Sequence, residues 1–445
     1  MSFEFFVPCP RGLESALAAE LAETGERRLP PGALVTGAEV PGGVHLRGNW
    51  AAGMAANLHS RLASRVLLKI AQRPYRSEHD IYALAHEQRW EQWFSANETL
   101  RVDVTAIKSP LRSLEFATLR VKDAICDRLR EVSGARPSID TAEPDVRVFA
   151  FLTATDCTLY LDTSGEPLFK RGWRLDKGAA PLRENLAAGI LRLTGWTPGT
   201  PLYDPMCGSG TFLAEAAQVA LDIAPGIERR FGFEKLKQYD KAAWRHLKDA
   251  ALQAREAARA EKRDLLIFGS DISGDMIEKA RANFARAGLA GVPLKQLDAR
   301  GMTAPAATPG ILVANPPYGE RIEVRGRGPR GEARPTGREL RAGGDGDEEG
   351  FRRARPDETD GEFFQAFGDA LKQRFTGWHA FVLTSDRKLP GQMRLRESTK
   401  TPLYNGALEC RLFRFDLVAG SVRQRAGATG SRDAGSDTSS DAPQA

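Results

Sequence analysis

Residues 201–211 read PLYDPMCGSGT and run into the helical pattern FLAEAA at 212–217. A short apolar strand here turns through glycines into a helix, which places backbone N–H groups beside a close-fitting ligand. The loop lacks the Gly-Lys-Ser/Thr of a phosphate-binding loop, and Asp204 precedes its glycines. A carboxylate at that point suits an amino group and would repel a pyrophosphate. The alternative is a glycine turn needed only for tight strand–helix packing.

A second strand end carries NPPY at 315–318, directly after the apolar run GILVA at 310–314. Two consecutive prolines fix φ and remove two backbone donors, so the Asn315 side-chain oxygen and the Pro316 carbonyl can both point outward as acceptors. Tyr318 offers a flat face on which a base can stack. The alternative is an ordinary loop, because Asn-Pro dipeptides are common turn formers. The candidate catalytic residues are therefore Asn315, Pro316, Pro317 and Tyr318.

Two more acids follow apolar runs, in LLIFGSD at 265–271 and LKQLDA at 294–299. In a doubly wound sheet, an acid placed like Asp271 commonly grips ribose hydroxyls. Asp298 could accept a hydrogen bond from an adenine amino group. Each acid has an alternative role as the N-cap of the helix that follows it. All four strand ends should lie at one edge of the sheet.

These motifs resemble a known group of enzymes. Residues 204–211 together with 315–318 look like the amino-methyltransferase group of class I S-adenosylmethionine enzymes. The stretches DTSGEPLFKRGWR at 162–174 and APLRENLAA at 180–188 resemble those of THUMP-containing bacterial enzymes that make N2-methylguanosine in large-subunit (23S) ribosomal RNA. The likeness runs from residue 1 to about residue 420, so it covers architecture as well as motifs.

The resemblance implies S-adenosyl-L-methionine as cofactor and assigns its contacts residue by residue. The loop would hold the cofactor, Asp271 its ribose and Asp298 its adenine side, while Arg183 and Asn185 match a segment near its methionine end. The candidate cofactor-binding residues are Asp204, Met206, Cys207, Gly208, Gly210, Thr211, Asp271, Asp298, Arg183 and Asn185. Cys207 has no cationic helper nearby in the sequence, so we interpret it as a small packing residue.

The resemblance also implies an α/β domain organisation. A ferredoxin-like α+β unit is expected at 1–58, a THUMP RNA-binding domain at 59–165, and a Rossmann-like class I methyltransferase domain with a doubly wound sheet at 166–423. Residues 324–358 and 424–445 have few large apolar side chains and cannot bury enough surface to offset the entropy of ordering. We expect both to be disordered.

Basic residues cluster locally, although the formal net charge of +5 is mild. One group precedes the catalytic half, where interspersed acids make a solvated mixed-charge surface a real alternative. That group comprises Arg120, Lys122, Arg128, Arg130, Arg136 and Arg147. The connector to the catalytic half interleaves basic and aromatic residues, which suits phosphate contact with stacking. Its candidate RNA-binding residues are Lys170, Arg171, Trp173 and Arg174.

Composition excludes several classes of protein. The longest apolar runs have strand length, and the N-terminus lacks the basic start and apolar core of a signal peptide. The five cysteines are scattered without C-x-x-C spacing, which argues against a disulfide scaffold or zinc knuckle. The six histidines show no metal-ligand spacing. We therefore expect a cytoplasmic protein without metal or membrane partner.

The chemistry we expect is methyl transfer to an exocyclic base nitrogen. Orientation and electrostatics would do most of the catalysis, without a metal or a strong general base. The pocket motif does not distinguish guanine from adenine, so guanine N2 methylation of transfer RNA and adenine N6 methylation of DNA stay open. A non-catalytic RNA-binding ribosome-assembly factor is the alternative outside the enzymes. Neither the modified nucleotide nor the oligomeric state follows from the sequence.

Overall fold

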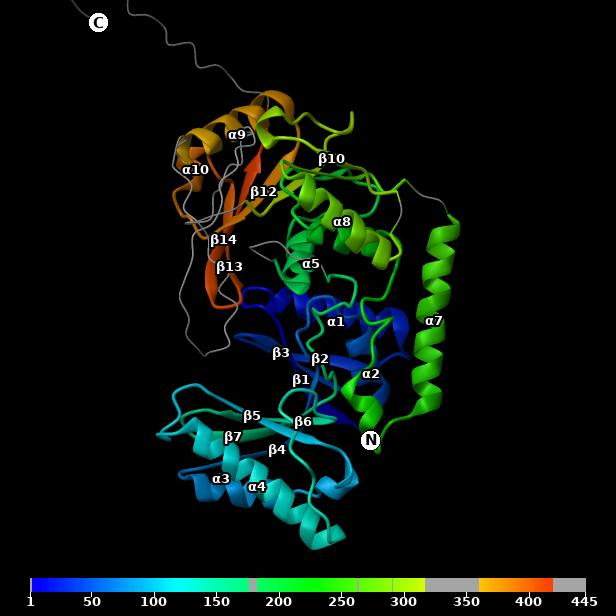
Figure 1. Ribbon diagram of the computed structural model, residues 1–445, viewed down its shortest axis with the longest axis vertical. Coiled ribbons are helices and arrows are strands. Elements are labelled where there is room, and N and C mark those ends of the chain that lie inside the picture. The colour runs from blue at the N-terminus through cyan, green and yellow to red at the C-terminus, as the bar shows by residue number, and fades with distance from the viewer. Residues whose placement is uncertain (1, 176–181, 262–263, 290, 317–359, 419–445) are drawn as a thin grey trace, which may run out of the picture.

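The residues that the structure describes form two sheets, one in each half of the chain (Figure 1). The computed structural model describes residues 2–175, 182–261, 264–289, 291–316 and 360–418. The stretches expected to be disordered, 324–358 and 424–445, lie outside the described residues, as do Pro317 and Tyr318.

The N-terminal sheet has seven strands and passes unbroken across the boundary that the sequence suggested at residue 58. Phe5 of β1 pairs with Leu68 of β4, which joins the first unit to the second. The strand order is β2 (Leu34–Val40), β3 (Gly43–Gly48), β1 (Phe3–Pro8), β4 (Leu67–Pro74), β7 (Asp156–Asp162), β6 (Val146–Leu152) and β5 (Leu100–Ala106). Its helices are α1 (Glu14–Arg28), α2 (Trp50–His59), α3 (Glu78–His86), η1 (Trp90–Gln92) and α4 (Leu114–Ser133).

The C-terminal sheet also has seven strands, and its order is that of a doubly wound fold. The order is β10 (Leu294–Gln296), β9 (Ile267–Asp271), β8 (Leu202–Asp204), β11 (Ile311–Ala314), β12 (His379–Thr384), β14 (Leu408–Asp416) and β13 (Thr399–Asn405). The first five strands are parallel, and β14 runs antiparallel to both of its neighbours.

Helices cover both faces of this sheet. Alternate residues of a strand point to opposite sides, and both sets of side chains on β11 are buried. Ile311 and Val313 belong to one buried cluster, with side chains from α5 (Glu184–Leu193), α6 (Thr211–Ala220) and α8 (Gly274–Arg286). Leu312 and Ala314 belong to a second cluster with side chains from further elements. Those elements are η3 (Ala299–Gly301), α9 (Asp360–Arg374) and α10 (Leu389–Gln392). The expected doubly wound α/β domain is confirmed.

The two halves meet in a buried ionic cluster. Glu215 on α6 is fully buried and accepts hydrogen bonds from Arg171 Nε at 3.1 Å and from Arg61 Nη1 at 3.3 Å. Arg61 lies between α2 and β4, whereas Arg171 lies in the connector between the halves. The segment between α6 and β9 contains η2 (Gly232–Lys235) and α7 (Lys241–Ala260), and α7 runs along one side of the molecule (Figure 1). The ionic cluster fixes the N-terminal sheet to the C-terminal domain.

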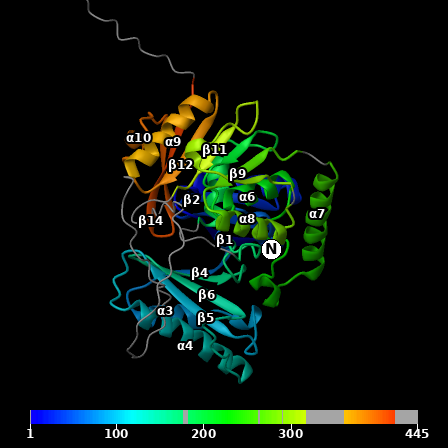
Figure 2. The same ribbon diagram turned by 45° about the horizontal axis from the view of Figure 1, so that its top comes forward.

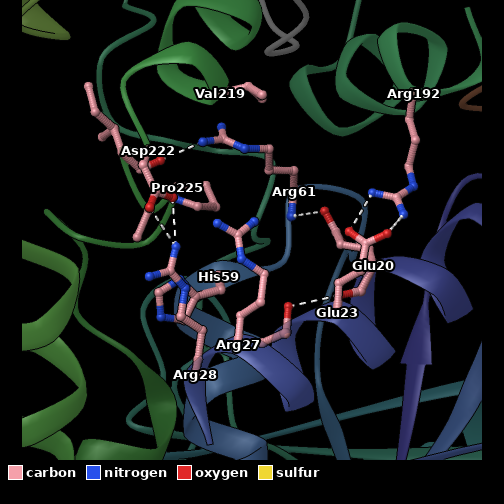
Figure 3. A pocket seen from close by; sticks show the side chains of 13 residues that line it. Glu20, Glu23, Arg27, Arg28, His59, Arg61, Arg192, Val219, Asp222 and Pro225 are labelled. Atoms are coloured by element: carbon pink, nitrogen blue, oxygen red, sulfur yellow. Dashed lines mark hydrogen bonds and ion pairs between the residues drawn. The ribbon is translucent and has the colours of Figure 1, made fainter. Parts of the chain in front are cut away.

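A cavity of about 190 Å³ opens beside this cluster. Figure 3 shows that its charged side chains face one another: Arg28 pairs with Asp222 at 2.7 Å and Arg192 pairs with Glu23. Arg61 donates to the backbone carbonyl of Ile223 in the same view. Because most of its cations already have partners, we assign the cavity to packing of the two halves.

Candidate functional site

The predicted site residues follow the carboxyl ends of adjacent parallel strands. Asp204 at the end of β8 lies opposite Gly269 on β9, and Tyr203 lies opposite Leu312 on β11. The chain leaves β8 toward β9 on one side and returns to β11 on the other, which makes this the switch point of the sheet. The expectation that the glycine loop and the start of the tetrapeptide share one edge is confirmed.

This edge of the sheet faces the N-terminal half. The guanidinium of Arg11 lies 5.1 Å from the ring of Tyr404 on β13, near the hairpin that closes the edge. At the start of α5, Asn185 Nδ2 donates to Ser64 Oγ at 3.1 Å and to the Leu62 carbonyl at 3.3 Å. Residues of the link between α2 and β4 therefore contact the C-terminal domain close to the site.

Asp204 is the most informative residue of the site. Its side chain is 2% exposed, and Oδ1 accepts a hydrogen bond from the Met206 N–H at 3.1 Å. No cation pairs with it among the described residues. Burial, followed by the nearby charge of Asp271, raises the pKa of Asp204 well above its ordinary value. A ligand with an amino group would supply the missing counter-charge.

The two glycines of the loop have different surroundings. A Cβ on Gly210 (φ +84°) would lie 2.7 Å from the Phe284 ring, so this position needs glycine for contact with α8. A Cβ on Gly208 (φ +53°) would meet nothing within 4 Å, so open space lies beside that backbone. Thr211 begins α6 directly after the loop, and Met206 is half-buried. The loop therefore leaves room beside its backbone at Gly208 and not at Gly210.

Cys207 is buried, and its backbone N–H donates to the Ser270 carbonyl at 2.9 Å. Burial is the largest cause that raises the pKa of its thiol well above the ordinary value. Such a thiol is a poor nucleophile, which agrees with its interpretation as a packing residue.

Asp271 ties the loops of β8 and β9 together. Its Oδ2 accepts from the Gly208 N–H at 2.8 Å and its Oδ1 from the Ser273 N–H at 2.9 Å. Burial raises the pKa of Asp271, and the two backbone donors oppose that shift. Each carboxylate oxygen keeps a second lone pair, so a ribose hydroxyl can still be accepted. The ribose contact stays a prediction.

Asp298 performs its alternative role as a cap. It is the N-cap of η3, and Oδ1 accepts from the Arg300 N–H at 2.8 Å. The Arg300 guanidinium also donates to Oδ2 at 2.7 Å, and this hydrogen bond is the largest cause that lowers the pKa of Asp298. The adenine-side role stays a prediction.

Asn315 follows β11 and carries an unpartnered acceptor. Its Oδ1 is buried and has no hydrogen-bond partner among the described residues. Leaving such an atom unsatisfied costs about 1–3 kcal/mol, so a donor from a ligand is the physical explanation we favour. Pro316 is buried beside it. The predicted roles of Pro317 and Tyr318 fall outside the described residues.

Arg183 and Asn185 contact their own surroundings rather than the glycine loop. Arg183 is the N-cap residue of α5, and its guanidinium lies 5.0 Å from the Phe169 ring. Asn185 is 1% exposed and keeps its Oδ1 without a partner, although its amide nitrogen is bonded. Their predicted contact with the cofactor's methionine end stays a prediction.

The predicted RNA contacts of the connector are wrong at three of four positions. Arg171 is 4% exposed and bonds Glu215, and Arg174 is 8% exposed with Glu184 3.4 Å away. Trp173 is 5% exposed. A cation held by a buried carboxylate cannot reach a phosphate, so the interleaved pattern reflects a buried junction. Lys170 alone is exposed, where it pairs with Glu166.

The partners of these buried cations were not predicted from the sequence. Glu215 lies on α6 among buried alanines, where burial of an unpaired acid would be costly. An acid inside an otherwise apolar helical pattern was the available signal, but the pattern does not predict which cation pairs with it. Folding brought Arg61 to it from 154 residues away.

The described residues contain neither a candidate metal site nor a candidate membrane span. Within the ranges that the structure covers, no three His, Cys, Asp or Glu side chains are grouped so that they could hold a metal ion. None of the described helices is both long and apolar enough to span a bilayer.

Comparisons with known proteins agree with this architecture. The chain matches the RlmL ferredoxin-like domain over residues 4–67, the THUMP domain over 75–162 and the RMKL-like methyltransferase domain over 171–330. A Synechocystis sp. protein, slr0064, which has a provisional name as an RNA methyltransferase, is 35% identical over 93% of this chain and 96% of its own. The chain belongs to the RMKL-like methyltransferase family with a THUMP domain. The resemblance drawn from the motifs is confirmed.

Within this family, the ribosomal RNA large subunit methyltransferase K/L of Aeromonas hydrophila is 36% identical over 94% of this chain and 55% of its own length. The corresponding protein of Pseudomonas paraeruginosa is 37% identical over 92% of this chain and 52% of its own. The chain therefore spans about half the length of these curated relatives.

Two solved structures share the whole fold. The crystal structure of SMU.472, named provisionally as a methyltransferase and complexed with SAH, matches with a TM-score of 0.76 at 26% identity, covering 95% of this chain and 99% of that one. The structure of a predicted N6-adenine-specific DNA methylase from Listeria monocytogenes matches with a TM-score of 0.73 at 28% identity, covering 93% and 96%.

Proposed function

We propose that this chain transfers a methyl group from S-adenosylmethionine to the exocyclic N2 amine of a guanosine in large-subunit ribosomal RNA. One observation carries the proposal. Among the described residues, Asp204 has no cation and Asn315 Oδ1 has no donor; Asp204 ends β8, and Asn315 directly follows the neighbouring strand β11. A ligand with an amino group and a substrate amine would satisfy the two groups together.

The residues at this edge fit the proposed cofactor. When bound, S-adenosylmethionine supplies an electrophilic methyl group on a positively charged sulfur. Asp204 would accept from the amino group of its methionine part, and the open space at Gly208 would admit its chain. Asp271 would accept from the ribose and Asp298 would lie on the adenine side. The structure of SMU.472 was solved with SAH bound, and this supports the assignment of the cofactor.

Asn315 would orient the base amine. Its Oδ1 and the Pro316 carbonyl each accept one amine hydrogen, which makes the nitrogen more pyramidal and turns its lone pair toward the methyl group. The new N–C bond forms as the S–C bond breaks, and the extra proton on nitrogen leaves to water. Tyr318 would stack on the extruded base and recover part of the unstacking cost of about a few kcal/mol.

The large-subunit RNA assignment rests on the family and on the relatives named for that activity. Guanine N2 methylation of transfer RNA uses the same acceptors, so the nucleic acid has to be identified by experiment. Adenine N6 methylation of DNA is the second candidate, because the Listeria relative is named for it.

Nucleoside mass spectrometry of cells that lack the gene separates these candidates. We expect N2-methylguanosine to fall in 23S ribosomal RNA and to return with the wild-type gene but not with Asn315→Ala. A fall confined to transfer RNA, or a loss of N6-methyladenine from DNA, would replace the proposed substrate. An unchanged nucleoside profile would reject the enzyme activity.

A further inference from the structure

The helix α7 is attached to the molecule through a narrow stripe of side chains. Asp240 caps its start, accepting hydrogen bonds from the N–H groups of Ala242 and Ala243 at 3.0 Å. The buried residues of this helix of 20 residues are Trp244, Leu247 and Ala251. Most of its surface is therefore free to contact a partner, and no part of it belongs to the site described above.

Three cations follow one side of the first half of α7. Lys241, Arg245 and Lys248 are spaced i, i+4 and i+7, which places them on one side of the helix, next to its buried stripe. Lys241 and Arg245 are exposed, and Lys248 is half-buried. None of the three forms an ion pair or a side-chain hydrogen bond with the described residues. Residues 241–248 contain no acid, so this side of the helix keeps its positive charge.

The cations in the second half of α7 are already paired. Arg255 continues the same side of the helix and bonds Glu228 at 3.2 Å and Glu256 at 3.0 Å. Arg259 bonds Glu256 at 3.4 Å and the Gly288 carbonyl at 3.2 Å. The stripe of cations thus has a half that serves the fold and a half that does not. The unpaired charge on α7 is confined to its first half.

The first half of α7 lies toward the N-terminal half of the chain. Just before the helix, the Lys237 N–H donates to the Trp93 carbonyl and Gln238 Nε2 donates to the Gln92 carbonyl, both at 2.8 Å, which fixes this end beside η1. Both ribbon views show α7 at the margin of the molecule (Figures 1 and 2). Because the site also faces the N-terminal half, the unpaired cations and the site lie toward the same end of the C-terminal domain.

We propose that the basic stripe of α7, formed by Lys241, Arg245 and Lys248, contacts the phosphate backbone of a double-helical segment of the RNA substrate. The proposal rests on RNA being the substrate. None of the exposed large apolar side chains among the described residues belongs to α7, so the stripe offers unpaired bases nothing to stack on. A duplex turns its phosphates outward and its bases inward. Cations spread over about 10 Å of a rigid helix suit such a row of phosphates.

The same composition separates RNA from an anionic membrane. A helix that lies on a bilayer combines its cations with exposed large apolar side chains, and α7 has none of these. Phosphate contacts fix the position of a nucleic acid and carry no sequence information. The basic stripe would therefore hold a duplex that flanks the target and would not select the base. Its variants should raise KM for RNA and leave kcat unchanged.

Arg245→Gln and Arg255→Gln form a matched pair, because they remove the same charge from the same side of one helix. We expect Arg245→Gln in the full chain to weaken binding of a fluorescein-labelled RNA duplex by about three- to tenfold and to lower the slope of log affinity against log salt by about 1. Arg245→Lys should bind like wild type. Arg255→Gln should keep the wild-type slope, since Arg255 already has acidic partners. An unchanged slope in Arg245→Gln, or an equal change in Arg255→Gln, would overturn the proposal.

A single-stranded oligouridine tests the form of RNA that the basic stripe contacts. Gln at all three positions of the stripe should reduce affinity for the duplex more than affinity for oligouridine. An equal or larger loss for oligouridine would reject the assignment to a double helix.

Methyl transfer by the same proteins separates this proposal from the proposed function. Asn315→Ala should bind the duplex like wild type and transfer no methyl group. If the wild type methylates RNA while the triple Gln variant keeps its KM and salt slope, the basic stripe is rejected and the function stands. If the variants weaken duplex binding as expected while the wild type methylates no RNA, the function is rejected and the stripe stands.

Discussion

Two buried carboxylates in the methyltransferase domain have opposite surroundings. Asp204 at the end of β8 and Glu215 on α6 are both almost fully buried. Glu215 accepts hydrogen bonds from the guanidinium groups of Arg61 and Arg171, whereas Asp204 receives one backbone N–H and no cation from the part of the chain that the structure describes. Burying an ionised carboxylate is costly unless a partner compensates it. A buried acid with its own cations therefore supports the fold, and one without them marks a place for a ligand.

Glu215→Gln should have the largest effect on stability. Removing one member of a buried ionic cluster leaves Arg61 and Arg171 without their counter-charge, which costs about 3–5 kcal/mol. Urea denaturation of the full chain measures this loss. Replacing Arg61, Arg171 and Glu215 together by Met should recover much of it, because well-packed apolar side chains often substitute for buried ions. A loss no greater for the single variant than for the triple would contradict the structural role of this cluster.

Asn315→Ala should have the largest effect on catalysis. Without the Oδ1 acceptor the amine is no longer held in place, and we expect kcat to fall by about 100-fold or more. Affinity for S-adenosylmethionine, measured by calorimetry, should stay near that of wild type. Asn315→Asp is the informative partner, because it keeps an acceptor at the same position and should retain more activity than alanine. Unchanged turnover in Asn315→Ala would rule out the amine clamp.

The fold followed from sequence patterns that are local. Strand–loop–helix patterning around Asp204 and the apolar runs before Asp271 and Asn315 predicted the parallel strands, and the structure confirms them. The order of these strands was not predicted, since periodicity alone does not specify which strands pair. The shared edge then followed from the rule for parallel sheets.

The errors concern residues whose environment is decided by distant contacts. Arg171 and Arg174 have the spacing of a surface patch, and nothing local shows that Glu215 and Glu184 will bury them. Asp298 is a local case, because the N–H that it caps belongs to Arg300, two residues further along the chain, and its adenine-side role stays a prediction. Sequence patterns therefore could not predict which residues far apart in the chain form ion pairs.

Asp204→Asn tests the contrast between Asp204 and Glu215, because it should affect stability and cofactor affinity in opposite directions. Affinity for S-adenosylmethionine should fall by about 10- to 100-fold, since a charged hydrogen bond to the amino group is lost. Without ligand, the variant should be at least as stable as wild type, because an uncompensated buried charge is gone. Calorimetry and urea denaturation measure the two effects. A ligand-free variant less stable than wild type would contradict the assignment.

The pH dependence of the same variant follows from the raised pKa of Asp204. The folded state holds this proton more tightly than the unfolded chain, so the contribution of Asp204 to stability is largest below the ordinary pKa of 3.8 and is lost as the pH rises through the folded pKa. Wild type without ligand should therefore lose stability relative to Asp204→Asn as the pH rises above 3.8. A constant difference between the two proteins across that range would show that Asp204 does not titrate as its burial indicates.

Lys170→Gln should have the smallest effect on stability, and it extends the comparison to an exposed charge. Lys170 and Glu166 form an ion pair in which both side chains are 58% exposed, and such pairs contribute about 0–1 kcal/mol because water screens them. Arg171→Gln, one residue away, should cost several times more, since Arg171 serves the buried Glu215. Urea denaturation of the two variants tests this difference between neighbours in the chain. Lys170→Gln should also lower RNA affinity if this exposed residue keeps its predicted phosphate contact. Equal destabilisation by the two variants would mean that the burial of Arg171 and Glu215 at the junction adds nothing to the stability of the protein.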